Sequence, residues 1–328
     1  LSDVHIGVCF NPEFTGDPAY TGLVGRQFSQ LTPEWNFQMP AILQADGTYD
    51  WTKADEITAF ARQHDQRVHA HSLIWYALDK IPNFQKLDGD RQTFTDAYVR
   101  HIRTVADRFS GVASSWDVVN EAVGEGGEGL RDCLWSRNLG TDDYILLAFQ
   151  TAAEADPNAI LFLNDYNLEL SPKKRATFMQ LVERLLRRGC PIGGIGTQTH
   201  LTLDVRPGMV SEAMRDLAGF GLKIHISEFD VAFGPASRTR LTYAQKQSIH
   251  TDLAAETMDA FLALPPTQRH AFSNWGARDR DSFLNRPSNG GDGTDVPDLF
   301  DNDARPKPAF WAIADRLAAD GGVSSGKP

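Results

Sequence analysis

Two glutamates, Glu121 and Glu228, each lie near the end of a short, mainly apolar run that we predict to be a strand. Paired carboxyl groups of this kind cleave glycosidic bonds: one protonates the leaving oxygen while the other attacks the anomeric carbon. A separation of about 5–5.5 Å gives retention of configuration, and a wider gap admits a water and gives inversion. Either glutamate alone is more simply a salt-bridged or solvated carboxylate. Their joint placement predicts Glu121 as the acid/base and Glu228 as the nucleophile.

The residues around this pair have the types that such chemistry needs. Asn120, directly before Glu121, can donate to a sugar 2-hydroxyl, a contact that strengthens in the transition state. Asp230 shares a strand face with Glu228 because side chains alternate with period two. With His200 from a neighbouring strand they predict an Asp–His–Glu chain that orients Glu228 and keeps it ionised. A histidine alone is more often a hydrogen-bonded core residue.

Two tryptophans, Trp75 and Trp275, end predicted strands among polar residues. Sugar rings present C–H faces that pack on indoles, so we predict that both line a sugar site, although most tryptophans are simply core residues.

A rival chemistry uses the pair His69 and His71, because barrels that hydrolyse amides hold a metal ion with an HxH pair. In those enzymes the pair lies on the first strand and has further ligands on later strands, which are not in place here. The segment 124–129 matches GxGxxG, but its two glutamates would repel a pyrophosphate, so we interpret it as a loop. We therefore expect no metal and no cofactor.

The elements that carry these residues alternate regularly along the chain. Eight predicted strands separated by amphipathic helices indicate parallel strands with crossover helices, and over about 300 residues they favour a single (β/α)8 TIM barrel over an open sheet. We expect this barrel to span residues 1–318 and a flexible tail to span 319–328. The strands are expected at His5–Phe10, Gln27–Thr32, Arg67–Trp75, Ser115–Asn120, Ile160–Asp165, Gly194–His200, Lys223–Phe229 and His270–Trp275. The clearest helices are expected at Thr52–His64, Thr93–Phe109, Asp143–Glu154, Pro172–Arg188, Val210–Phe220 and Tyr243–Leu264.

The composition narrows the class of ligand. With 43 acidic and 32 basic residues, the chain has a formal net charge of −11, which argues against nucleic acid or an anionic membrane as a partner. No apolar run is long enough to span a membrane. We expect Cys9, Cys133 and Cys190 to be buried thiols, with one disulfide at most. We also expect a monomer that acts on a neutral β-linked polysaccharide or oligosaccharide. The location of such polymers, and the lack of Met at position 1, suggest an extracellular or periplasmic enzyme.

Seven motifs along the chain resemble those of glycoside hydrolase family 10, whose typical members are endo-β-1,4-xylanases. Each alone is weak, but their common order makes the resemblance strong. They are Thr32-Pro-Glu34, His71-Ser-Leu-Ile-Trp75, Trp116-Asp-Val-Val-Asn-Glu121, Asn164-Asp-Tyr-Asn167, Gly193-Gly-Ile-Gly-Thr-Gln-Thr-His-Leu201, Ile226-Ser-Glu-Phe-Asp230, and Trp275-Gly276 with Asp279, Ser282 and Pro306-Lys-Pro-Ala309.

The resemblance implies the same catalytic pair, with support from Asn120, Gln198, His200 and Asp230. It also implies a set of substrate-binding residues, mainly on the glycone side of the cleavage point. These are Glu34, Trp35, Gln38, His71, Trp75, Tyr166, Trp275 and Phe283.

Five positions depart from the family pattern, and all belong to the glycone side. Trp35 and Gln38 stand where the family usually has Asn and Lys, Tyr76 and Leu78 where it has His and Gln, and Phe283 where it has a second Trp. Bulky or apolar groups thus replace polar ones, which predicts a narrower, more apolar sugar site and weak activity on plain xylan. The main interpretation is a xylanase-like retaining hydrolase. The alternatives are the same mechanism on another β-glycoside, such as a saponin-like or aryl glycoside or another β-glycan, and a non-catalytic carbohydrate-binding barrel.

Overall fold

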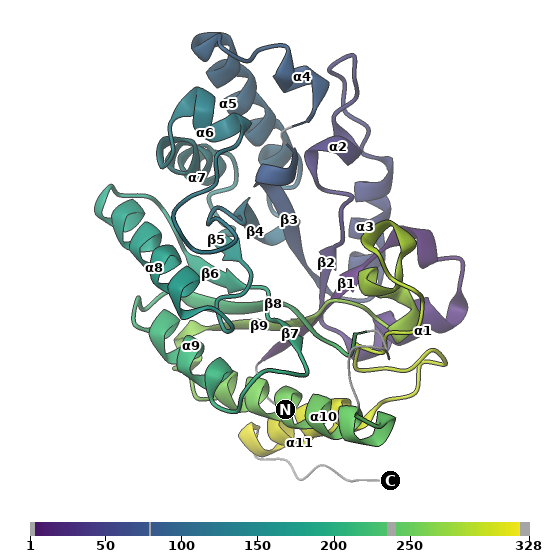
Figure 1. Cartoon of the computed structure of the whole chain (residues 1–328). Coiled ribbons are helices and arrows are strands. Elements are labelled where there is room, and N and C mark those ends of the chain that lie inside the picture. The colour runs from purple at the N-terminus through teal and green to yellow at the C-terminus, as the bar shows by residue number, and fades with distance from the viewer. Residues whose placement is uncertain (1–3, 79, 235–240, 322–328) are drawn as a thin grey trace. The chain divides into compact units, whose positions relative to one another are not determined.

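The computed structural model describes residues 4–78, 80–234 and 241–321 (Figure 1). The chain divides into two compact units. One comprises Leu1–Gln30 with Thr197–Pro328, and the other comprises Leu31–Gly196. We refer to them as the terminal unit and the central unit.

The central unit is a sheet whose strands β2 to β6 lie side by side in chain order, with β3, β4 and β5 running parallel. Its strands are β2 (Gln30–Pro33), β3 (Arg67–Trp75), β4 (Ala113–Asn120), β5 (Ile160–Asp165) and β6 (Gly194–Thr197). Its helices are α2 (Met39–Ile42), α3 (Thr52–Gln63), α4 (Pro82–Gln85), α5 (Arg91–Arg108), α6 (Leu134–Leu139), α7 (Asp143–Ala155) and α8 (Pro172–Arg187), with a 3-10 turn at Tyr76–Leu78.

Strand and helix formation in this unit follows from simple patterns. All but the end residues of β3 are buried, as expected for a parallel strand that is covered on both faces. Helix α5 begins after Asp90, whose side chain accepts from the backbone N of Thr93 as an N-cap. The buried face of α5 includes Phe94, Tyr98 and Ile102 at a spacing of four. Burial of apolar side chains thus holds β3 and α5 in place.

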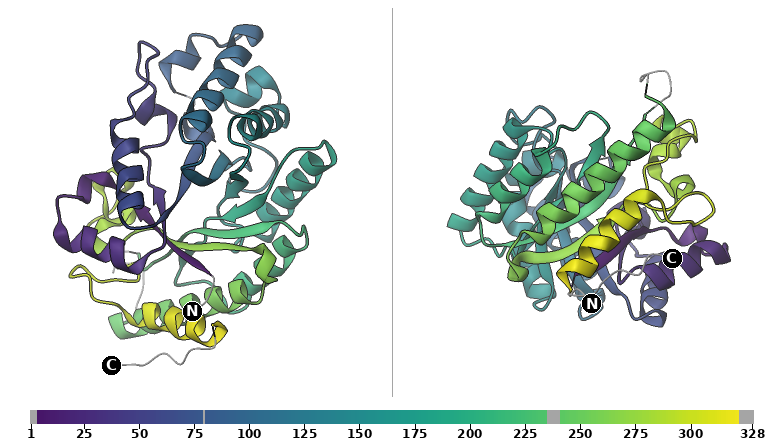
Figure 2. Two further views of the ribbon diagram at one scale, coloured as in Figure 1. Left: turned by 180° about the vertical axis from the view of Figure 1, so that it is seen from behind. Right: turned by 90° about the horizontal axis from the view of Figure 1, so that it is seen from below.

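Among the described residues of the terminal unit, four strands lie in the order β1-β9-β8-β7, and the pairs β1–β9, β7–β8 and β8–β9 are parallel. Figure 2 shows α10 and α11 packed side by side in this unit. Its strands are β1 (His5–Phe10), β7 (His200–Thr202), β8 (Lys223–Ala232) and β9 (Arg269–Asn274). Its helices are α1 (Pro18–Gln27), α9 (Met209–Ala218), α10 (Tyr243–Leu262) and α11 (Pro308–Asp320), with 3-10 turns at Pro12–Phe14, Pro266–Gln268, Asp279–Asp281, Phe283–Asn285 and Pro287–Asn289.

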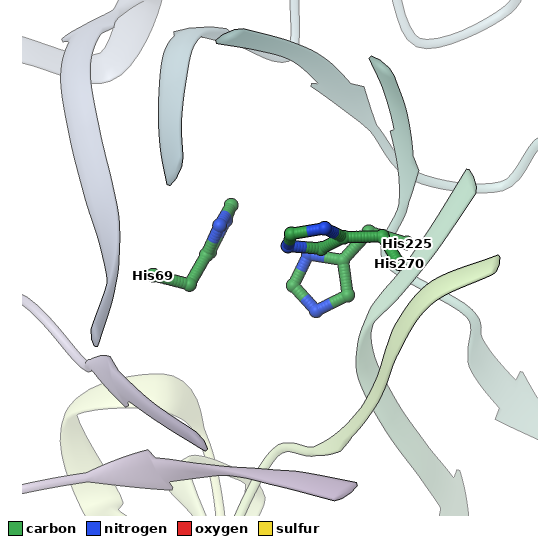
Figure 3. A group of neighbouring side chains, drawn as sticks. All are labelled: His69, His225 and His270. Atoms are coloured by element: carbon green, nitrogen blue, oxygen red, sulfur yellow. The ribbon is translucent and has the colours of Figure 1, made fainter. Parts of the chain in front are cut away.

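The interior of the terminal unit contains a layer of hydrogen-bonded polar side chains. His225 Nε2 lies 2.8 Å from Ser273 Oγ, and Gln30 Nε2 lies 3.4 Å from each of these atoms. The ring of His270 meets that of His225 edge to face at a centroid distance of 5.2 Å (Figure 3). Figure 3 also draws His69, which belongs to the central unit. The hydrogen bonds among Gln30, His225 and Ser273 offset part of the cost of burying these side chains.

The predicted and observed elements agree closely, with two corrections. The second strand begins at Gln30 rather than Gln27, because helix α1, capped by Asp17 and started by Pro18, continues through Gln27. The predicted strand Gly194–His200 is interrupted, because Thr199 takes a left-handed φ of 58° between β6 and β7. Helices α1, α2, α4, α6 and α11 were not predicted.

The remaining expectations concern the termini, the membrane and the cysteines. Helix α11 extends to Asp320, and residues 322–328 of the predicted tail lie outside the described residues. None of the helices in the described ranges is both long and apolar enough to cross a bilayer. All three cysteines are buried and free, as predicted.

Candidate active site

Glu228 projects from β8 and is almost completely buried, with 4% of its surface exposed. Its backbone N donates to the carbonyl oxygen of Gln198 at 3.1 Å, so the break between β6 and β7 fixes the backbone of the nucleophile candidate. Gln198 is itself buried, with 3% of its surface exposed. The two predicted residues are therefore joined through the main chain.

His200 links Glu228 to Asp230, as the sequence predicted. His200 Nδ1 lies 2.9 Å from Asp230 Oδ2, and His200 Nε2 lies 3.3 Å from Glu228 Oε2. The pairing of β7 with β8 sets this geometry, because His200 stands opposite Asp230 in the register. Burial would lower the pKa of His200, but the neighbouring carboxylates of Asp230 and Glu228 outweigh it and raise that pKa well above its ordinary value. Both ring nitrogens of a charged imidazole donate, which matches two carboxylate acceptors.

Two aromatic rings pack on His200. The ring centroid of Trp275 lies 6.4 Å away and that of Phe283 lies 5.4 Å away. The backbone N of Trp275 donates to the carbonyl oxygen of Phe229 at 2.9 Å, which ties it to the residue after Glu228. Trp275 is 7% exposed and Phe283 is half-buried. The terminal unit thus brings six predicted site residues together: Gln198, His200, Glu228, Asp230, Trp275 and Phe283.

Glu121 directly follows β4 in the central unit and has an unusual backbone. Its φ is 58°, in the left-handed region that a non-glycine residue seldom adopts and that costs roughly 1–3 kcal/mol. Two hydrogen bonds hold this conformation: Glu121 N donates to Asn164 O at 2.8 Å, and Arg131 Nε donates to Glu121 O at 3.0 Å. The sharp turn changes the direction of the chain at the acid/base candidate.

Asn120 is oriented by the next strand. Asn164 Nδ2 donates to Asn120 Oδ1 at 3.0 Å, which leaves Asn120 Nδ2 on the side of the Glu121 carboxyl, 3.4 Å from its Oε1. This arrangement presents an amide donor beside the Glu121 carboxyl group, as a contact to a sugar hydroxyl requires.

Arg131 was missed by sequence reasoning, although it makes several contacts around Glu121. Besides the Glu121 carbonyl oxygen, its guanidinium donates to Tyr166 Oη at 2.6 Å and to Glu125 Oε2 at 3.4 Å. Its Cζ lies 3.9 Å from the ring centroid of Tyr76. Burial raises the pKa of Tyr76, and the Glu121 charge adds to the effect. Nothing in the local sequence marks Arg131, because its contacts depend on the turn at 124–129.

A buried ion pair lies beside Tyr166 and supports the turn after Glu121. Lys174 of α8 and Asp165 at the end of β5 have fully buried side chains and are 2.9 Å apart. Asp165 also accepts from the backbone N of Val123 at 3.0 Å, two residues after Glu121. Burial raises the pKa of Asp165 to about 6, although Lys174 opposes the shift. The Lys174 Nζ lies 3.2 Å from the ring centroid of Tyr166.

The predicted glycone-side residues of the central unit differ in accessibility. Trp35 is 41% exposed, Glu34 and Trp75 are half-buried, and Gln38 is 7% exposed. His71 is 3% exposed, and its Nδ1 lies 2.8 Å from Asp117 Oδ2.

The HxH pair of the rival metal hypothesis has partners of its own. His69 Nε2 lies 3.0 Å from the same Asp117 oxygen, and its Nδ1 lies 2.7 Å from Ser115 Oγ. Both histidines therefore point nitrogens at Asp117 inside the sheet, which accounts for their burial without an ion.

The chain alternates parallel strands with helices and carries Glu121 and Glu228 at strand ends in hydrogen-bonded surroundings, an arrangement typical of the glycoside hydrolases. The family model described as "Glycosyl hydrolase family 10" matches residues 2–316, and the chain belongs to this family.

The relatives agree with this assignment. The chain is 33% identical over 324 residues to an endo-1,4-beta-xylanase of Geobacillus stearothermophilus, covering 95% of each protein. It is 31% identical to endo-1,4-beta-xylanase A of Cellvibrio japonicus, covering 97% of this chain and 56% of that protein, so it spans about half the length of this relative. A solved structure of a thermostable mutant of xylanase Xyn10A from Cellvibrio japonicus has a TM-score of 0.86 and 31% identity, with 97% and 98% of the two chains covered. The predicted family and the (β/α)8 fold class are confirmed.

Proposed function

We propose that this chain is a retaining β-glycosidase that hydrolyses xylan or decorated xylan in the manner of an endo-1,4-β-xylanase. Family membership and the xylanase names of the relatives support the reaction class. The observation that carries the assignment is the Asp230–His200–Glu228 chain, with contacts of 2.9 and 3.3 Å. A carboxylate that accepts a hydrogen bond from an imidazolium is fixed in direction, as a nucleophile must be.

The reaction would proceed by two displacements. Glu228 attacks the anomeric carbon while Glu121 gives its proton to the glycosidic oxygen, so the bond to the leaving sugar breaks as the glycosyl ester forms. Glu121, now a carboxylate, then takes a proton from water as the water attacks the same carbon, and the ester to Glu228 breaks. Configuration at the anomeric carbon is inverted twice and hence retained. The retaining mechanism requires the two carboxyl groups to lie about 5–5.5 Å apart.

The neighbours would each act at a stated point of this cycle. Asn120 Nδ2 would donate to the 2-hydroxyl as positive charge develops on the ring. His200 would hold Glu228 in position before attack and stabilise it as a leaving carboxylate in the second step. Trp75, Tyr166 and Trp275 would pack on sugar rings, with Glu34 and His71 at hydroxyl groups.

The glycone side is where we expect this enzyme to differ from an ordinary xylanase. Trp35 offers an exposed indole, whereas Gln38 and Leu78 are buried and present little polar surface. Phe283 packs on His200. These groups favour an apolar, narrow sugar site, so a decorated xylan, a short oligosaccharide or an aryl glycoside would be preferred to the plain polymer. The same replacements are the observation that favours the second candidate, the same mechanism on another β-glycan.

The decisive experiment is a comparison of rates and products on linear xylan, arabinoxylan, aryl xylobioside and aryl cellobioside. Retaining cleavage of xylosides with slow turnover of the linear polymer supports the proposal. Full activity on linear xylan would contradict the narrowed site, and faster turnover of the cellobioside would favour the second candidate. We also propose that residues 1–318 act as one catalytic domain and that the enzyme is a monomer. It would act outside the cytoplasm, because its polymeric substrate lies outside cells.

A further inference from the structure

Trp275 is held in the terminal unit through the residues on either side of it. Asn274 Nδ2 donates to Asp298 Oδ1 at 3.1 Å and also to the carbonyl oxygen of Gly276. Asp298 lies so close to Gly276 that a Cβ built on this glycine would collide with Asp298 Oδ2. Asp298 is 0% exposed. One buried carboxyl group therefore contacts both neighbours of the tryptophan that packs on His200.

The cations near Asp298 bind other carboxylates. Lys307 Nζ lies 2.9 and 3.2 Å from the two oxygens of Asp279, and it also donates to Val296 O at 2.7 Å. Asp279 is thus paired with Lys307, and its Oδ1 accepts from the backbone N of Asp298 at 2.9 Å. The ammonium group of Lys307 is therefore directed at Asp279, not at Asp298.

Asp281 and Asp230, two further carboxylates that act on Asp298, have partners of their own. Arg278 forms a bidentate contact with Asp281 at 2.7 and 3.0 Å. Asp230 is bonded to His200. Within the described residues, Asp298 Oδ2 has no hydrogen-bond partner, and neither has Asn274 Oδ1. An ionised carboxylate with one amide donor and no cation is costly to bury, whereas a protonated carboxyl is neutral and gains a donor.

We propose that Asp298 works in its protonated, neutral form and that this carboxyl group is a positioning residue for Trp275 and, through Trp275 and His200, for Glu228. The positioning role rests on the proposed function, and the protonation does not. Burial raises the pKa of Asp298 well above its usual range, and the negative charges of Asp279, Asp230 and Asp281 add to the shift while Lys307 opposes it. The neutral state is retained at neutral pH.

The protonation is tested by unfolding the full chain in denaturant between pH 4 and 7, using Asp298→Asn as a neutral isostere. In the wild type, Asp298 ionises on unfolding and releases a proton. The wild type therefore loses stability relative to D298N as the pH rises above the ordinary aspartate value, and the ratio of the two unfolding constants grows by up to about tenfold per pH unit. The matched control is Asp204→Asn, which removes a carboxyl group from an exposed position of the same unit.

A second measurement observes the proton directly. The infrared difference spectrum between wild type and D298N should contain the C=O stretching band of a buried carboxylic acid at pH 7, and the spectrum between wild type and D204N should not. An unfolding ratio that is constant with pH, or a spectrum without this band, overturns the protonation whether or not the chain hydrolyses any glycoside.

The positioning role is tested by kinetics on an aryl xylobioside well below the unfolding temperature. We expect D298N to keep kcat within about threefold of the wild type, and Asp298→Ala to lower kcat at least tenfold with little change in KM. Circular dichroism and the unfolding midpoint verify that D298A is folded under the assay conditions. A folded D298A with wild-type kcat overturns the positioning role, and so does a D298N as impaired as D298A. If the wild type cleaves no glycoside, the proposed function fails while the two protonation measurements still decide the state of Asp298.

Discussion

Asp230→Asn is the substitution that isolates the role of the histidine chain. It removes one negative charge and keeps the shape of a side chain that is 1% exposed. His200 then loses the carboxylate 2.9 Å from its Nδ1 and retains only Glu228, 3.3 Å from its Nε2. Because Asp230 is a main cause of the raised pKa of His200, the imidazole becomes neutral at lower pH in the variant.

The size of the effect follows from the bond that is lost. A hydrogen bond to a charged group contributes about 1.5–3 kcal/mol. If that energy is expressed in the transition state, kcat/KM falls by about 10- to 150-fold, since each factor of ten corresponds to about 1.4 kcal/mol. The loss should be larger at high pH, because the raised pKa keeps the wild-type imidazole charged there and the variant loses this charge first.

The assay is kcat/KM on an aryl xylobioside from pH 4 to 9, with unfolding midpoints measured at each pH. Asp204→Asn serves as the control for removing an exposed carboxyl group. We expect D230N to lose at least tenfold at its optimum and to have an alkaline limb shifted to lower pH. A variant within threefold of the wild type at every pH, with an unmoved alkaline limb, would show that Asp230 does not act on Glu228 through His200.

Three further predictions concern other parts of the molecule. Glu121→Ala should lower the turnover of xylan at least about 100-fold, and the turnover of aryl glycosides with good leaving groups by less. Added azide, which replaces water as the attacking group, should restore turnover of the aryl glycosides. An equal loss on all substrates without recovery would argue against an acid/base role. Arg131→Met should lower kcat by about tenfold or more with little change in KM, because the Glu121 carbonyl loses its donor at 3.0 Å. The control Arg137→Met, which changes an exposed guanidinium, should leave kcat unchanged. Equal kinetics for the two variants would show that Arg131 does not position Glu121. Burial lowers the pKa of His101 to about 3, so below about pH 6.5 the unfolded chain binds a proton that the folded chain does not. The free energy of unfolding should therefore fall as the pH drops below about 6.5, by up to about 1.4 kcal/mol per pH unit. In denaturant titrations the difference in unfolding free energy between His101→Phe and the wild type should change with this slope, and a pH-independent difference would contradict the prediction.

Much of the fold was predictable, because burial on both faces gives parallel strands a plain signature. The apolar runs of β1, β3 and β5 coincide with the observed bounds. Helix α1 was missed despite a cap at Asp17 and a first-turn Pro18, because Gly22 and Gly25 lower its helix propensity. The break at Thr199 was not predictable, since left-handed backbone at threonine has no sequence signal.

The site residues that adjoin a strand end were predictable from the sequence, whereas those that come from distant parts of the chain were not. Asp230 follows from Glu228 by alternation, and the His200 contact follows from the neighbouring strand. Arg131, Lys174 and Asp298 reach the site through turns, a helix and a long loop, so their contacts depend on the tertiary structure. Polar residues with distant partners therefore escape sequence reasoning even when they are fully buried.

The role of Glu228 as nucleophile can be observed by mass spectrometry of the enzyme trapped with a 2-deoxy-2-fluoro xylobioside bearing a good leaving group. The fluorine slows hydrolysis of the glycosyl ester, so the intermediate accumulates and can be mapped by peptide. We predict one added disaccharide per chain, attached to Glu228 in the peptide that contains Ile226–Asp230. A label on another residue would show that Glu228 is not the nucleophile, and so would an enzyme that hydrolyses the non-fluorinated substrate but never forms a covalent adduct.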